Sequence, residues 1–285
     1  MSMTPREWFR RLTFGLDTVL SLDRKGFFIP YRHARSVSAP ARYPAIEALF
    51  EDALPEMASA IDAIESVAED LKAIARHAPA PNPRWDQDWF CGLDAAMLYA
   101  QIRLHRPAHV VEIGSGHSTR FAARAIADGA LDTRLIAIDP EPRADLAALK
   151  VEWHRETLQQ ALKNSGGHVI AEFRPGDLLF VDSSHILMPG TDVELILTEL
   201  LPRLPAGALV QIHDIFLPES YPAEWAWRGY NEQAAVAVLL ASGGWDILFA
   251  SRFAQQRFGE RLRAGPLGAL ADAGGPASSL WLAKR

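Results

Sequence analysis

The chain has 285 residues, a net charge of −6, 49% hydrophobic residues, 22% charged residues and one cysteine. A chain of this length can bury a large core, and no apolar run approaches the roughly 20 residues that cross a bilayer, so no integral membrane segment is expected. With one cysteine and no signal-peptide pattern in residues 1–12, we expect a protein of the reducing cytoplasm. Because Lys and Arg do not cluster, nucleic acid is not an expected partner, and a small molecule is.

The first predicted element, Arg6–Leu20, is basic and amphipathic. Such a segment suits either a membrane surface or a protein surface. Its basic patch is short and no lipidation motif accompanies it, so we expect it to dock on the same chain or on a second subunit. In the second case the protein is a homo-oligomer that assembles through its N-terminal helices.

Between Ile46 and Ala75 the apolar residues recur at steps of three and four, which predicts amphipathic helix, with a second helix beginning at Pro55. The proline-rich stretch PAPNPR, residues 79–84, predicts a linker. We therefore predict an N-terminal helical region with its linker at residues 1–84 and a second domain at residues 85–285.

After the linker, short apolar runs rich in β-branched residues alternate with helical patterns. This alternation predicts an α/β protein with a Rossmann-like, doubly wound sheet. The runs are His109–Ile113, Leu135–Ile138, Val151–His154, Leu178–Val181, Ala208–Ile212, Trp245–Ala250 and Ser279–Leu282. The helical patterns are Thr119–Asp128, Pro142–Leu149, Thr157–Lys163, Asp192–Leu201 and Tyr230–Ala241.

Polar residues gather at the carboxyl ends of these runs, where ligands bind in doubly wound sheets. The residues in question are Glu112, Gly114, Ser115, Gly116, Asp139, Glu156, Thr157, Asp182, His185, His213 and Asp214. Carboxylates at four consecutive strand ends predict a ligand site there.

The first strand end reads EIGSG, from Glu112 to Gly116. Its glycines allow a ligand to approach the backbone, and the helix start that follows favours negative charge. The stretch lacks the third glycine of a dinucleotide fingerprint, and Glu112 would repel a pyrophosphate but suit a cation. Asp139, at the second strand end, is placed to bind ribose hydroxyls. These residues predict a cofactor that carries a positive charge and a ribose.

Four stretches together resemble the class I S-adenosylmethionine-dependent methyltransferases, in particular their small-molecule branch. They are EIGSG at Glu112–Gly116, IAIDP at Ile136–Pro140, LLFVDSSH at Leu178–His185 and the strand end at Asp214. The resemblance covers residues 89–285 and implies a seven-stranded sheet whose last strand is antiparallel.

The same resemblance implies roles for the cofactor residues. Glu112, Gly114 and Gly116, with Ser115 between the glycines, would surround the methionine moiety. Asp139 would bind the ribose hydroxyls, and Thr157 would lie near the adenine. The third glycine that is frequent in the family falls at Ser118 here.

A second group of residues is Asp182, His185, His213 and Asp214. Catechol-type methyltransferases hold a divalent cation at the ends of the fourth and fifth strands, and by that resemblance Asp182, His213 and Asp214 would bind a metal ion. A histidine in place of an acid shifts the preference away from Mg²⁺. Without metal, His213 would serve as a general base with a pKa near 6.5. His185 would either act beside Asp182 or only begin the next helix.

Two aromatic segments remain open to two interpretations each. The segment 216–233 holds Tyr221, Trp225, Trp227 and Tyr230 and would either lie over the mouth of the pocket or pack against the N-terminal helices. The segment Arg84–Phe90 would either cover the cofactor or join the linker to the sheet, and we favour the second.

The sequence therefore predicts an enzyme that transfers a methyl group from S-adenosylmethionine to an oxygen or nitrogen of a small polar acceptor, with or without a divalent metal. The predicted catalytic residues are His213, Asp182 and His185. An NAD-dependent oxidoreductase is one alternative, which the glycine spacing disfavours. A non-catalytic nucleoside-binding protein is the other.

Overall fold

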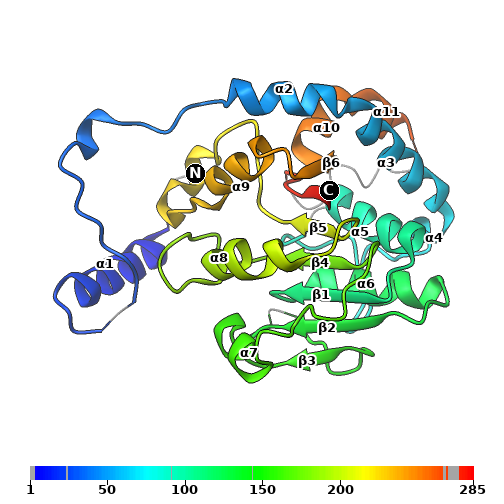
Figure 1. Ribbon diagram of the computed structural model, residues 1–285, viewed down its shortest axis with the longest axis horizontal. Coiled ribbons are helices and arrows are strands. Elements are labelled where there is room, and N and C mark those ends of the chain that lie inside the picture. Colours follow the sequence, from blue (N-terminus) through cyan, green and yellow to red (C-terminus); the bar gives the residue numbers. More distant parts are fainter. Residues whose placement is uncertain (1–3, 24, 91, 143, 266–267, 269–275) are drawn as a thin grey trace.

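The computed structural model describes residues 4–23, 25–90, 92–142, 144–265, 268 and 276–285. Its centre is a seven-stranded sheet in the order β3-β2-β1-β4-β5-β7-β6 (Figure 1). The strands are β1 (His109–Ile113), β2 (Arg134–Ile138), β3 (Glu152–His154), β4 (Leu178–Val181), β5 (Leu209–Ile212), β6 (Trp245–Ala250) and β7 (Leu280–Lys284). β7 is antiparallel to both β5 and β6, so the predicted Rossmann-like sheet with an antiparallel last strand is confirmed.

The central strands are covered on both faces, which is why they are almost continuously apolar. All residues of β4 and β5 are buried, and in β1 only His109 is partly exposed. The connections are α6 (His117–Asp128), α7 (Leu158–Asn164) and α8 (Asp192–Leu195), the last continuing through a π-helical turn η2 (Ile196–Leu200) and a 3-10 turn η3 (Leu201–Arg203). The parallel strands thereby direct their carboxyl ends to one edge of the sheet.

The helix predicted at Pro142–Leu149 is wrong in the part of it that the structure describes. There the Asp145 carboxylate accepts a hydrogen bond from the Ala147 amide over 3.0 Å. Such a local bond competes with helix formation.

The N-terminal helices α2 (Pro44–Asp52), α3 (Leu54–Ser66) and α4 (Ala68–Lys72) contribute side chains to the hydrophobic core of the sheet, and α3 contacts β6 directly. Pro55 stands in the first turn of α3, as predicted. The ring of Phe50 lies 5.5 Å from that of Phe253 in α10 (Ser251–Arg257). The division of the chain at residue 84 stays a prediction.

The helix α5 (Gly92–His105) was not predicted and is central to the fold. It packs against α3 and α6, and its residues from Gly92 to Ile102 are all buried. The remaining helices are α1 (Pro5–Val19), η1 (Ala34–Ser36), η4 (Ala223–Arg228), α9 (Glu232–Ala241) and α11 (Gly259–Ala264). Among the described residues, no helix has the length and apolar character needed to cross a membrane.

Candidate active site

A cavity of about 480 Å³ opens at the carboxyl ends of β1, β2 and β4. Four residues predicted to bind the cofactor line it: Gly114, Ser115, Asp139 and Thr157. Asp182, which follows β4, lines it as well. The fold therefore brings most of the predicted cofactor residues to one cavity and places a predicted catalytic carboxylate in its wall.

Gly114 is required where the ends of β1 and β4 meet. Its φ is +79°, and a Cβ atom there would lie well inside van der Waals contact of the Asp182 carbonyl oxygen. The Asp182 amide donates to the Ile113 carbonyl over 2.8 Å, which holds the two strand ends together. The space beside Gly116 is open, since a Cβ atom there would meet no atom within 4 Å. The two glycines of the motif therefore have different functions.

Glu112 lies beneath the glycine turn and is 1% exposed. Its carboxyl group accepts hydrogen bonds from the hydroxyls of Ser118 and Thr119 in the first turn of α6, the second over 2.6 Å. Burial raises the pKa of Glu112 to about 8, against these two hydrogen bonds. The group is therefore mostly protonated near neutral pH and joins β1 to α6. Ser118 anchors this contact at the position of the family's third glycine.

Asp139 lines the cavity, and both of its carboxylate oxygens accept hydrogen bonds from neighbouring loops. One oxygen accepts from the Ser115 amide over 2.7 Å and from the Ser115 hydroxyl over 3.0 Å, and the other accepts from the Glu141 amide over 2.7 Å. Thr157 caps α7, accepting from the Gln160 amide over 3.3 Å. Both side chains are thus held in fixed positions at the cavity wall.

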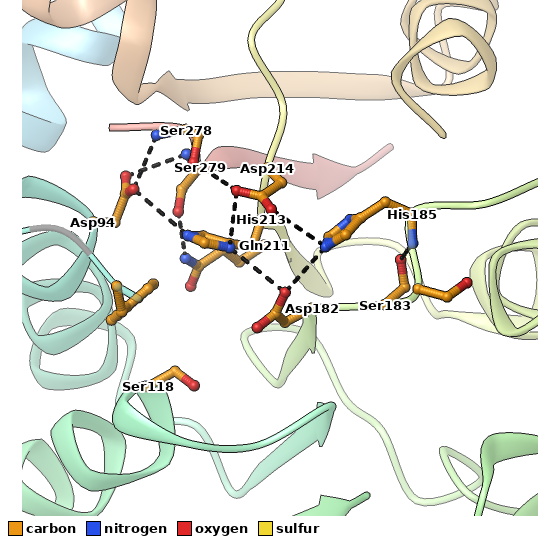
Figure 2. A network of polar contacts seen from close by, with 12 residues as sticks. Asp94, Ser118, Asp182, Ser183, His185, Gln211, His213, Asp214, Ser278 and Ser279 are labelled. Atoms are coloured by element: carbon orange, nitrogen blue, oxygen red, sulfur yellow. Dashed lines mark hydrogen bonds and ion pairs between the residues drawn. The ribbon is translucent and has the colours of Figure 1, made fainter. Parts of the chain in front are cut away.

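The predicted catalytic residues form one cluster, in which the two imidazoles are buried and Asp182 is partly exposed (Figure 2). His185 Nε2 lies 3.3 Å from Asp182 Oδ1 and 3.4 Å from Asp214 Oδ2. His213 Nδ1 lies 3.6 Å from the same Asp182 oxygen and 3.5 Å from Asp214 Oδ1. The two imidazoles therefore share the two carboxylates. Ser118 stands apart from this cluster in Figure 2.

Backbone strain accompanies the cluster. His185 has a φ of +60° and Asp214 a φ of +56°, values that non-glycine residues adopt at a cost of about 1–3 kcal/mol each. Both residues lie just after adjacent strands. Strained residues of this kind often mark functional sites, and here the strain turns both side chains toward the shared contacts.

Two further carboxylates hold the outer sides of the imidazoles, and neither was predicted. Glu232, in the first turn of α9, lies 2.9 Å from His185 Nδ1 and also accepts from the Ser183 hydroxyl. Asp94, in the first turn of α5, lies 3.8 Å from His213 Nε2 and accepts from the amides of Ser278 and Ser279. Each imidazole therefore lies between carboxylates.

These surroundings decide the charge of the imidazoles. Burial alone would lower the pKa of His213, but the charges of Asp214 and Asp182 raise it to about 9. The pKa of His185 is also raised well above its ordinary value, because Asp182 and Glu232 outweigh the effect of burial. The two imidazoles in turn hold the pKa of Asp182 below its ordinary value, although burial opposes this. Both histidines thus favour the protonated form more than a free imidazole does.

The metal ion predicted on Asp182, His213 and Asp214 finds no support. In the part of the chain that the structure describes, no group of three or more His, Cys, Asp or Glu side chains could hold one. A protonated imidazole has no lone pair to offer a metal, and the imidazolium groups already provide positive charge to the carboxylates. The donor set as it stands does not fit a metal ion.

Residues 111–215 match a protein family described as a methyltransferase domain. This segment of the chain is therefore similar to a methyltransferase domain. The matched segment begins in β1 and ends just beyond β5, so it includes the cavity at Gly114 and the cluster from Asp182 to Asp214. The resemblance seen in the sequence motifs is thereby confirmed. Curated protein sequences give no match.

Solved structures similar to this chain are distant in sequence. An O-methyltransferase from Bacillus cereus in complex with S-adenosylhomocysteine is 12% identical, with 85% of this chain and 97% of that chain covered and a TM-score of 0.43. The S-adenosylhomocysteine-bound methyltransferase PaMTH1 from Podospora anserina is 13% identical, with 91% and 99% covered and a TM-score of 0.35. The O-methyltransferase TomG from Streptomyces achromogenes is 17% identical, with 78% and 88% covered and a TM-score of 0.33. Likeness at this level carries no argument about the ligands of this chain.

The aromatic segment 216–233 covers His185. The Tyr230 ring lies 4.6 Å from the imidazole of His185, and the Asn231 amide donates to the His185 carbonyl over 3.0 Å. Trp225 contacts Phe216 and Tyr230, and the guanidinium of Arg228 stacks on it at 4.1 Å. The segment is therefore an ordered cover over one half of the cluster.

The segment Arg84–Phe90 joins the linker to the domain. The Trp85 indole donates to the Ile74 carbonyl over 2.9 Å and packs 5.0 Å from the ring of Phe121 in α6. Phe90 continues this contact and lies 5.3 Å from the imidazole of His213. The segment thus has the joining function that the sequence favours, and its last aromatic ring also packs against the cluster.

Proposed function

We propose that this chain transfers a methyl group from S-adenosylmethionine to an oxygen or nitrogen of a small polar acceptor. The observation that carries this proposal is the position of Asp182. Its carboxylate lines the cavity that holds Gly114, Ser115, Asp139 and Thr157, and it contacts both imidazoles of the buried cluster. A single side chain thereby links the space for a cofactor to groups that can move a proton.

The cavity suits the proposed cofactor in size and in the chemistry of its wall. Its volume of about 480 Å³ lies within the range of small-molecule sites. Asp139 offers carboxylate oxygens to ribose hydroxyls, and Asp182 offers a negative charge to the sulfonium. The open space beside Gly116 leaves room for the methionine moiety near the start of α6.

On the acceptor side, His213 is the proposed general base. In the transfer, the acceptor oxygen forms a bond to the methyl carbon while the carbon–sulfur bond breaks and its electron pair stays on sulfur. The acceptor proton passes to the neutral form of His213. A pKa of about 9 makes this imidazole a strong proton acceptor, close in pKa to a phenol or an ammonium group. Alignment of acceptor and sulfonium would supply the other large contribution to the rate.

Calorimetric titration tests the cofactor. We expect saturable binding of S-adenosylhomocysteine and none of NAD at the same concentration. Binding of NAD alone would favour the oxidoreductase alternative. Transfer of a labelled methyl group from S-adenosylmethionine to a panel of phenols, hydroxy acids and amines then tests catalysis, and cofactor binding without transfer to any member would favour the binding protein. Activity should persist in a chelator, because no step uses a metal.

A further inference from the structure

The N-terminal arm, defined as residues 4–40, differs in character from the remainder of the chain. Of the eighteen large apolar side chains that are exposed in the described residues, thirteen belong to this arm. Residues 1–39 contain seven Lys or Arg and three Asp or Glu, a net charge of +4 in a chain whose net charge is −6. Figure 1 shows α1 at the margin of the molecule, joined to α2 by a long connection. The arm is thus apolar, basic and exposed.

The apolar side chains of α1 form one stripe. Trp8, Phe9, Leu12, Leu16, Val19 and Leu20 form two series with spacings of three and four, 9–12–16–19 and 8–12–16–20. The Leu20 amide continues the helix by donating to the Leu16 carbonyl. Each of the six is at least 42% exposed. Monomeric proteins rarely expose contiguous apolar surface of this extent, so the stripe requires a partner.

Two partners have the right chemistry, an anionic membrane and a second copy of this chain. The connection after α1 decides between them. Phe28, Ile29 and Tyr31 are all more than half exposed, and residues 26–31 form neither helix nor strand. Backbone groups without regular hydrogen bonds are costly in hydrocarbon but can be satisfied at a protein surface by side chains and water. A second copy accommodates the whole arm, whereas a membrane accommodates only α1.

We propose that two copies of this chain dimerise through their arms, with the two α1 helices packed antiparallel along the apolar stripe. The centre of the stripe lies near Phe14, so Trp8 of one copy would lie opposite Leu20 of the other. In this register the dipoles of the two helices oppose each other. Residues 40–285 carry a net charge of −10, so the part of each basic arm beyond α1 would meet a body of opposite charge in the other copy.

The first experiment measures the mass of the full chain in solution by light scattering. We expect about twice the 31.4 kDa of the chain. Phe9→Glu with Leu16→Glu places charges in the stripe and should weaken the dimer at least about 30-fold, the effect of losing central contacts of an interface. Thr18→Glu, on the opposite side of α1, is the matched control and should remain dimeric. A monomeric wild type, or a dimer unaffected by the double substitution, would overturn the proposal, and so would a monomer that sediments with phosphatidylserine vesicles.

Disulfide trapping tests the antiparallel register, in a Cys91→Ser background. A mixture of Trp8→Cys and Leu20→Cys proteins should form the mixed disulfide under mild oxidation. Trp8→Cys alone should not cross-link, because antiparallel packing separates its two copies by about 18 Å along the helices. Efficient cross-linking of Trp8→Cys alone would show parallel packing and contradict the proposed interface.

Discussion

Replacement of Glu112 by Gln should make the stability of the protein less dependent on pH. The carboxyl group has an ordinary pKa of 4.5 in the unfolded chain and a pKa of about 8 in the folded protein, raised by burial. Below the lower value both states hold the proton. As the pH rises from there, the unfolded chain releases its proton while the folded protein retains it, so the free energy of unfolding falls until the pH passes about 8.

The loss is about 1.4 kcal/mol for each pH unit, so wild type should lose about 2–3 kcal/mol from this group between about pH 5 and about pH 7. Glutamine cannot ionise, and its amide can still meet the hydroxyls of Ser118 and Thr119. Urea unfolding of both proteins, followed by tryptophan fluorescence at the two pH values, measures how the free energy of unfolding of each protein changes with pH. Glu56→Gln, at an exposed position of α3, should keep the pH dependence of wild type. Equal pH dependence in wild type and Glu112→Gln would refute the assignment of a neutral, buried carboxyl group.

Three further predictions concern the site. Gly114→Ala should lower the melting temperature strongly, because its Cβ atom would overlap the Asp182 carbonyl at a positive φ, whereas Gly116→Ala should fold like wild type; equal melting temperatures would contradict the tight contact of β1 and β4. Asp139→Ala should weaken S-adenosylhomocysteine binding by about 1.5–3 kcal/mol in calorimetry, and unchanged affinity in the folded variant would remove the ribose assignment. His213→Asn should lower turnover by about 10² while cofactor affinity stays the same, and the wild-type rate should rise with pH through about 9; a rate that is flat across that range would leave His213 without a role as base.

The sequence predicted the sheet well because its strands are short and clearly bounded. Every predicted strand lies within two residues of an observed one. The helix α5 was missed for a physical reason. It is buried on all sides, so the stretch GLDAAMLYAQI has no polar face and shows no helical period. Hydrophobic periodicity detects helices that have one solvent-exposed face, and α5 has no such face over most of its length.

The site was predicted as far as it is formed by strand ends. Asp182, His185, His213 and Asp214 follow adjacent parallel strands, so the topology alone brings them together. Glu232 and Asp94 enter the cluster from the first turns of two helices, and nothing in their local sequence marks them. The sequence predicts a pKa of His213 not far from 6.5, moved up by neighbouring carboxylates, and the fold raises it to about 9, because the size of the shift depends on which carboxylates surround the imidazole.

The arrangement of charge in the cluster favours methyl transfer to a group that releases a proton. Four carboxylates surround two imidazoles, so the buried cluster has fewer positive than negative groups even when both imidazoles are protonated. A sulfonium beside Asp182 would supply a missing positive charge and make it easier for His213 to release its proton. In the proposed reaction the sulfur would become neutral as the methyl group leaves, and the acceptor proton would return positive charge to His213. The positive charge would thereby move across Asp182 from the cofactor cavity to the imidazole, and the carboxylates of the cluster would never be left with less compensation than before. Preserving this balance during the transfer gives a physical reason for one aspartate to face both the cavity and the histidines.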